Sequence, residues 1–158
     1  MLAEDSFQKI NSPIALNGQR AAGLRFADPR VHPLWHALIL FRLLANGFRS
    51  ADLRNHLAAL SGRTPEMIGR GAMTYQLRRL RLHGMIERIP RSHRYRVTDA
   101  GFRTALFFTR SYNRLLRPAL AAVLPNHHAA ATLLKRSFDA LDTRIAAWLA
   151  KTNFASQT

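Results

Sequence analysis

Apolar residues recur at helical spacing along most of this chain. The stretch LWHALILFRLLANG, residues 34–47, is apolar almost all round and follows Pro33. Proline suits the first turn of a helix and glycine suits the position after its end, so a buried first helix is predicted over residues 33–46. Ser50 is a good N-cap for a second helix. The apolar face of that helix consists of Leu53, Leu57 and Leu60.

A third helix is predicted over residues 71–83, with Gly84 in the left-handed position that often ends a helix. At 100° per residue, one side of this helix is apolar and meets the core. That side consists of Met73, Leu77, Leu80 and Gly84. The opposite side consists of Gly71, Tyr75, Arg78, Arg79 and Leu82, with Thr74 and Arg81 on one flank. Leu82 does not fit a side that faces water.

A β-hairpin and a fourth helix follow. Residues 85–89 and 94–97 are predicted to be short strands, and Pro90-Arg91-Ser92-His93 supplies the turn between them. Thr98 is a good N-cap for a helix from Asp99 to about Arg117, which Pro118 ends. The helices and the hairpin together predict a mostly α fold with a small β-hairpin.

The two ends of the chain differ in pattern. Residues 1–27 contain Ser, Asn, Pro and Gly without clear periodicity and are predicted to be an N-terminal tail or arm. A last helix is predicted over about 128–151, with an apolar seam at spacings of three and four. The seam consists of Ala131, Leu134, Phe138, Leu141, Ile145 and Trp148. It either packs on the chain's own first or fourth helix or forms a subunit interface. We favour a dimer interface of Phe138, Leu141, Ile145 and Trp148.

The distribution of charge along the chain suggests a binding partner. The chain has 24 Lys and Arg against 9 Asp and Glu, a formal net charge of +15. Twelve arginines lie between Arg70 and Arg117, against the two acids Glu87 and Asp99, so this segment contributes +10. Such a concentration on a compact helix-hairpin unit suggests a polyanionic partner, and its layout suggests duplex DNA.

Composition also excludes several classes of protein. No run reaches the roughly 18 apolar residues that a membrane span needs, and the N-terminus lacks the pattern of a secretory signal. The absence of cysteine excludes disulfides and thiolate metal sites. His127 and His128 have no further ligand at metal-binding spacing, and no catalytic motif is present. The sequence therefore predicts a cytoplasmic protein that is not an enzyme and has no metal or cofactor.

The segment LRRLRLHGMIERIPRSHRYRVTDAG, Leu77 to Gly101, resembles the signature of bacterial winged-helix repressors of the MarR, PadR and ArsR types. The matching residues are Leu77, Leu80, Gly84, Met85 and Ile86, then Val97, Thr98 and Gly101. The resemblance covers about residues 34–117. It implies a winged helix-turn-helix domain at 28–118, followed by a C-terminal helical extension at 119–158 that serves for dimerisation or packs in cis.

The resemblance places the third helix in the major groove of DNA, with its first residues on base edges. The residues that would face the bases are Gly71, Thr74, Tyr75 and Arg78. The residues that would contact phosphates are Arg70, Arg79 and Arg81. The basic residues of the wing alternate along its strands, so some of them would contact the flanking backbone, and Arg91 could enter a minor groove. These residues are Arg88, Arg91, His93, Arg94 and Arg96. Tyr75 also has a structural interpretation as a partly buried packing aromatic.

Two functions are consistent with these observations. The first is a homodimeric transcriptional regulator that binds double-stranded DNA and is associated with the bacterial nucleoid. The second is an adaptor inside a larger replication, recombination or defence assembly, which binds DNA or RNA mainly by charge. The third helix favours the regulator. The long loop before that helix, the unmatched N-terminal segment and the very high basicity favour the adaptor.

Overall fold

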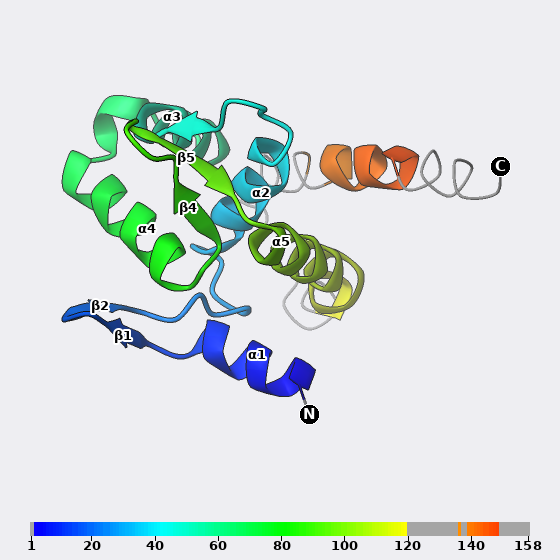
Figure 1. Ribbon diagram of the computed structural model, residues 1–158. Coiled ribbons are helices and arrows are strands. Elements are labelled where there is room, and N and C mark those ends of the chain that lie inside the picture. The colour runs from blue at the N-terminus through cyan, green and yellow to red at the C-terminus, as the bar shows by residue number, and fades with distance from the viewer. Residues whose placement is uncertain (1, 120–135, 137–138, 149–158) are drawn as a thin grey trace, which may run out of the picture.

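The computed structural model describes residues 2–119, 136 and 139–148, and these form a mostly helical protein with small antiparallel sheets (Figure 1). The elements before the central helices are α1 (Leu2–Asn11), β1 (Ile14–Leu16) and β2 (Gln19–Ala21). The central elements are α2 (His32–Phe41), β3 (Phe48–Arg49), α3 (Ser50–Leu60), the 3₁₀ turn η1 (Pro65–Met67) and α4 (Arg70–Leu82). The last labelled elements are β4 (Ile86–Arg88), β5 (Arg94–Val97), α5 (Asp99–Ser111) and the π turn η2 (Tyr112–Leu116).

Four predicted helices lie close to where the sequence placed them, and the first is shorter than expected. α2 ends at Phe41 rather than at residue 46. Arg42, at its C-cap, donates to the carbonyl of Val97 at 2.8 Å and pairs with Asp99. These bonds tie the end of α2 to the start of α5, so residues 42–47 turn back toward the sheet instead of continuing the helix.

Strand β3 was not predicted, because a two-residue strand carries no periodic signal. Phe48 pairs with Tyr95 and Arg49 with Arg94, so the second sheet has the order β3-β5-β4. Gly47 precedes β3 with a φ of +66°, and a Cβ there would lie 2.2 Å from the carbonyl oxygen of Tyr95. Glycine at this position therefore allows the chain to enter the sheet beside β5.

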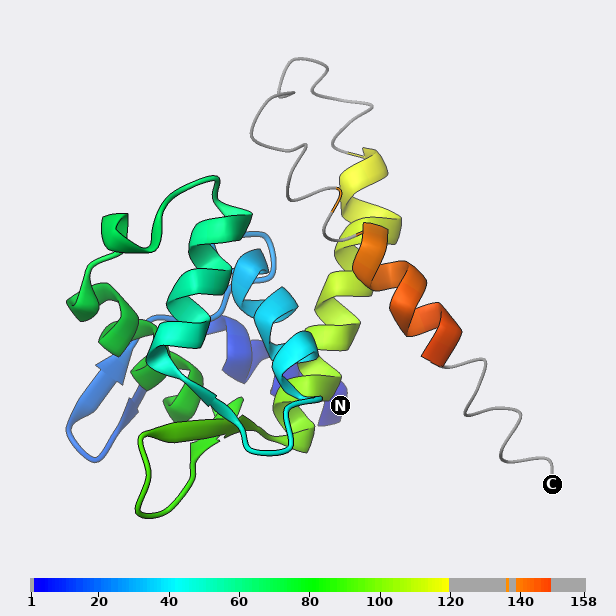
Figure 2. The ribbon, with the colours of Figure 1, turned by 90° about the horizontal axis from the view of Figure 1, so that it is seen from above.

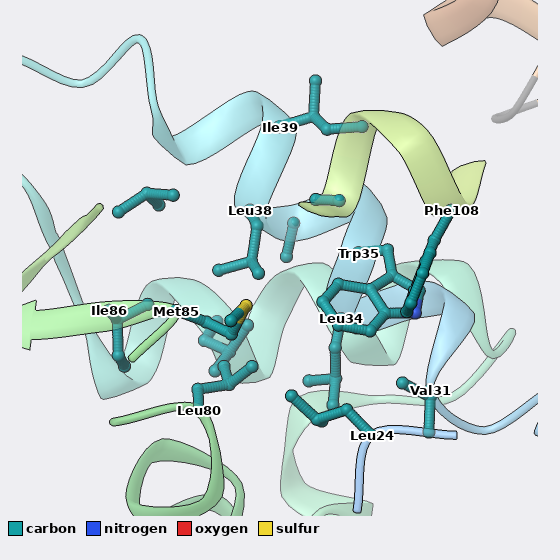
Figure 3. Packing of buried hydrophobic residues seen from close by; sticks show 14 of the residues in the cluster. Leu24, Val31, Leu34, Trp35, Leu38, Ile39, Leu80, Met85, Ile86 and Phe108 are labelled. Carbon is teal, nitrogen blue, oxygen red and sulfur yellow. The ribbon is translucent and has the colours of Figure 1, made fainter. Parts of the chain in front are cut away.

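A single apolar core joins α2, α4, the second sheet and α5 (Figure 3). Trp35 is 1% exposed and meets Phe108 edge-on, with ring centroids 5.0 Å apart. Leu80 and Ile86 lie in this core, as the helix phase predicted. The predicted apolar side of α4 therefore does face the core.

The junction between the β4–β5 hairpin and α5 also agrees with the sequence. Gly84 has a φ of +71° after the end of α4. Thr98 caps α5, because its hydroxyl oxygen accepts from the amide of Gly101 at 2.9 Å. Gly101 packs so closely on β4 that a Cβ would lie 2.0 Å from the carbonyl oxygen of Met85. These local signals position the hairpin against the two helices that flank it.

The N-terminal segment, predicted to be a tail or an arm, contains regular elements that pack on the rest of the chain. Residues 2–21 form α1 and the β1–β2 hairpin, which lie along one side of α4 in Figure 1. Leu24 is fully buried, and Phe26 packs in an aromatic cluster with Phe7 and Phe108. The weak periodicity misled the prediction, because short elements are held here by contacts with distant residues rather than by their own pattern.

The C-terminal seam is partly covered within the chain. Residues 139–148 are helical, and Leu141 and Ile145 are buried in the apolar core at 3% and 7% exposure. Arg117 and Asp139 form an ion pair at 3.2 Å, which ties this helix to the end of α5. Trp148 is half exposed and meets Phe102 edge-on. Packing in cis therefore accounts for Leu141 and Ile145, against our preferred assignment, while Phe138 lies outside the described residues.

No helix within residues 2–119, 136 and 139–148 is both long enough and apolar enough to cross a membrane.

Candidate nucleic-acid interface

Helix α4 lies between two β-hairpins. It contacts β1 and β2 on one side and β4 on another. In Figures 1 and 2, the start of α4 and the tips of both hairpins reach the same side of the molecule, away from α5. This arrangement leaves one end of α4 accessible between two projecting hairpins.

One strip of α4 faces solvent. Arg70, Gly71, Thr74 and Arg81 are exposed, and Arg78 is half-buried beside them. The Arg78 guanidinium carbon lies 5.5 Å from the centre of the Tyr75 ring, an attractive geometry that orients this side chain. We call these five residues the α4 strip. They were all predicted site residues, and the structure brings them together.

The other part of the predicted α4 site is covered by residues 19–23. The Tyr75 hydroxyl accepts from the amide of Ala22 at 3.2 Å. Arg79 Nε donates to the carbonyl of Ala22 at 3.1 Å, and a terminal nitrogen of Arg79 donates to the carbonyl of Gly23. Arg79 is only 8% exposed, and burial lowers the pKa of its guanidinium. Arg79 is therefore bonded within the chain rather than free for a phosphate, and the contact of Tyr75 fits its second interpretation, a partly buried packing aromatic.

The N-terminal segment also explains Leu82, which did not fit a side facing water. Leu82 lines an open hollow of about 550 Å³ with residues of α1 and β1, among them Ile10 and Ile14. His83 Nε2 lies 3.0 Å from the carbonyl oxygen of Ala22, and burial lowers the pKa of this imidazole. The side of the C-terminal half of α4 that carries Arg79 and Leu82 is thus a packing surface, while Arg78 and Arg81 lie on the other side.

Two basic residues of the β4–β5 hairpin are bonded to backbone carbonyls, although Arg88 is itself exposed. Arg88 Nε donates to the carbonyl of Ser92 at 3.1 Å, within the turn. Arg94 donates to the carbonyls of Asn46 and Gly47 at 3.3 and 3.2 Å, which ties the turn end of β5 to the residues just before β3.

The remaining basic residues of this hairpin are exposed. Arg96 is paired with Glu87 on the neighbouring strand. Arg91 and His93 are exposed at the tip, where Arg91 has a φ of +57°. The tip therefore carries the side chains of this hairpin that are best placed to meet a partner.

Two residues missed by the sequence reasoning adjoin the α4 strip. Gln19 accepts from Arg81 at 3.4 Å, and Arg20 is exposed on the β1–β2 hairpin. The signal that could have found them is Asn17-Gly18, a dipeptide typical of tight hairpin turns. Asn17 and Gly18 have positive φ angles of 49° and 73°.

A second polar cluster lies away from this surface. His36 Nδ1 and His56 Nε2 are 2.9 Å apart, and their rings stack with centroids 5.0 Å apart. Burial, with a smaller contribution from His36, lowers the pKa of His56 to about 4. Among the described residues no group of three or more His, Cys, Asp or Glu side chains is arranged to hold a metal ion. The pair is a packing contact between α2 and α3.

No protein-family model, no curated protein and no solved structure matches this chain. The resemblance of Leu77–Gly101 to the repressor signature therefore stays a prediction. The features of this chain that bear on function are the α4 strip and the two hairpins.

Proposed function

We propose that this chain is a winged helix-turn-helix protein that binds double-stranded DNA. The order α2-β3-α3-α4-β4-β5-α5 and the strand order β3-β5-β4 support this proposal. In such a fold α3 and α4 form the helix-turn-helix unit, and β4–β5 forms the wing. The N-terminal residues of the second helix of that unit reach base edges in the major groove.

The observation that carries the proposal is the α4 strip, which places Arg70, Arg78 and Arg81 along one side of α4 that faces solvent. Arg78 is the candidate for a bidentate contact with guanine, worth roughly 1–3 kcal/mol of discrimination. Arg70 and Arg81 flank it and are the candidates for phosphate contacts, which fix register without reading sequence. On the wing, the exposed Arg91 is the candidate contact with the flanking backbone.

Binding should depend steeply on salt, because each neutralised phosphate releases condensed counterions. With roughly 5–8 phosphate contacts per chain, log affinity should fall with log salt at a slope of about −0.9 per contact. Fluorescence anisotropy with a mixed-sequence duplex over a salt series measures this slope. A slope shallower than about −2 would contradict duplex binding of this kind.

The proposal separates base contacts from backbone contacts. Arg78→Ala should relax the preference at one base position. Arg91→Ala should weaken binding to all duplexes alike and reduce the salt slope by about 1. Arg91 is the better test of the wing than Arg94, because the side chain of Arg94 is already bonded to the carbonyls of Asn46 and Gly47. Equal weakening of every sequence by both changes would show that α4 does not read bases.

Within this proposal, the more specific function is a homodimeric transcriptional regulator of a bacterial nucleoid. Two α4 helices related by a two-fold axis would lie about 34 Å apart, one turn of duplex. Selection from random duplex DNA, read by sequencing, tests this function directly. A dyad-symmetric consensus supports the regulator.

The second candidate is an adaptor that binds DNA or RNA by charge within a larger assembly. Two observations favour it: the N-terminal segment covers Tyr75 and Arg79, and Leu141 and Ile145 are buried in cis. The first reduces the surface available for reading bases, and the second reduces the surface available for a symmetric dimer. Selection without a consensus, together with comparable affinity for duplex DNA and RNA, supports the adaptor.

A further inference from the structure

The β1–β2 hairpin has a well-defined turn and a solvent-exposed tip. Ile14 pairs with Ala21 and Leu16 with Gln19, so the turn has two central residues. Positive φ at both of them is typical of a type I′ turn, which matches the twist of a hairpin. The exposed residues of the tip are Leu16, Asn17, Gly18, Gln19 and Arg20.

This hairpin is a permanent part of the flank of α4 rather than a removable cover. Ala21 is 5% exposed and Leu24 is fully buried. Gly23 approaches α1 so closely that a Cβ would lie 2.0 Å from the carbonyl oxygen of Asn11. Lifting the segment would expose these residues and strand the buried guanidinium of Arg79, which is costly. The hairpin therefore stays beside α4 when α4 meets its partner.

The position of the tip relates it to the wing. In both ribbon views it projects on the same side as the start of α4 and the tip of the β4–β5 hairpin (Figures 1 and 2). Gln19 accepts from Arg81, so the tip is continuous with the α4 strip. Arg20 follows Gln19 and lies on the opposite face of the hairpin from Ala21, where α4 does not cover it.

We propose that the β1–β2 hairpin is a second DNA-contacting hairpin, with Arg20 on a backbone phosphate. The major groove is about 12 Å wide and admits one helix or one two-stranded ribbon, not both side by side. With α4 in the groove, the β1–β2 hairpin lies over the sugar-phosphate backbone at one edge, and the wing lies over the backbone at the other. This inference rests on the proposed function and extends its binding surface.

The absence of cysteine from the chain allows a direct test by single-cysteine photocrosslinking. Leu16→Cys reports on the β1–β2 tip and His93→Cys on the wing tip, each labelled with a short photoreactive group. Leu115→Cys is the matched control, because Leu115 is 71% exposed but belongs to η2, away from both hairpins. The probe is a mixed-sequence duplex of about 30 base pairs, roughly three helical turns.

Crosslinking to the duplex from positions 16 and 93, without crosslinking from position 115, is the expected result. Crosslinking from position 93 alone would overturn the second hairpin and leave the proposed function standing. No crosslinking from either hairpin would contradict the proposed function itself. Crosslinking of equal yield from all three positions would show unspecific association and overturn both.

The salt dependence of affinity gives an independent readout for Arg20. Arg20→Ala should reduce the slope of log affinity against log salt by about 0.9, the contribution of one phosphate contact. Arg114→Ala removes the same charge from an exposed position in η2 and should leave the slope unchanged. Equal slopes for Arg20→Ala and the unmodified protein would overturn the contact. Thermal melting of both variants checks that each is folded.

Discussion

Replacing Arg79 by alanine tests the most consequential difference between the sequence and the structure. The sequence predicts a phosphate contact at this position, whereas the structure buries the guanidinium against the N-terminal segment. Its Nε donates to the carbonyl of Ala22 at 3.1 Å, and a terminal nitrogen donates to the carbonyl of Gly23. Arg79→Ala removes both bonds, so the carbonyl of Gly23 loses this donor, while His83 Nε2 still lies 3.0 Å from the carbonyl of Ala22. We therefore expect loss of stability.

The magnitude follows from these contacts. A hydrogen bond to a charged group contributes about 1.5–3 kcal/mol, and the two bonds share one guanidinium, so they are not additive. Removing a buried charge also relieves its desolvation, which offsets part of the loss. We expect the free energy of unfolding to fall by about 2–4 kcal/mol. For a chain of this size, that lowers Tm by roughly 6–12 °C.

Urea denaturation followed by circular dichroism measures the change, and two variants serve as controls. Arg81→Ala removes an exposed arginine from the same helix and should change stability by less than about 0.5 kcal/mol. Arg79→Lys keeps the charge but lacks the fork that reaches two carbonyls, so it should fall between alanine and arginine. Hydrogen exchange at the amide of Ala22, which donates to Tyr75, should accelerate in Arg79→Ala.

One outcome would refute this reasoning directly. If Arg79→Ala keeps full stability and loses affinity for DNA together with about one unit of salt slope, Arg79 is a phosphate contact. The N-terminal segment would then not cover α4 in solution, and the prediction made from the sequence would be correct.

Three further predictions concern the core, pH and assembly. Leu80→Ala should lower the free energy of unfolding by roughly 2–5 kcal/mol, because Leu80 is fully buried. Leu43→Ala, at a 76% exposed position, should lower it by less than about 0.5 kcal/mol. Equal melting temperatures for the two variants would show that the assigned helix phase is wrong. Burial holds the pKa of His56 at about 4, below the ordinary value of about 6.5. As the pH drops from 6.5 to 4, the His56 imidazole is protonated in the unfolded chain before it is protonated in the folded chain. The free energy of unfolding should therefore fall over this range. His56→Gln should reduce the pH dependence of the urea-derived stability across that window, leaving the part due to His32 and His83, whose pKa values burial also lowers, and an unchanged slope would contradict the assignment. Homodimerisation stays a prediction, and light scattering on the intact protein at micromolar concentration checks it. A monomeric protein would exclude the symmetric regulator. Leu141→Glu should destabilise the fold, because Leu141 is buried within its own chain.

Elements whose signals are local could be predicted from the amino-acid sequence alone. Thr98 and Gly84 mark the boundaries of α5 and α4 through a side-chain cap and a left-handed backbone, which need no distant contact. The spacing of Met73, Leu77 and Leu80 fixed the buried side of α4 for the same reason. The concentration of arginine after residue 70 likewise follows from composition.

Which arginines of α4 face outward depends on packing by a distant segment of the chain. Arg78 and Arg79 are neighbours on the side away from the core, and the helix pattern treats them alike. They differ because residues 19–23 cover one flank of that side, so Arg79 is bonded within the chain while Arg78 remains in the α4 strip.

The same physical reason explains the other differences. Strand β3 exists because Phe48 meets Tyr95 across the sheet, and Leu141 is buried because its helix folds back onto the chain's own core. Both depend on contacts between segments that are far apart in the sequence. Local periodicity states that a side chain must be covered, but only packing between distant segments determines what covers it.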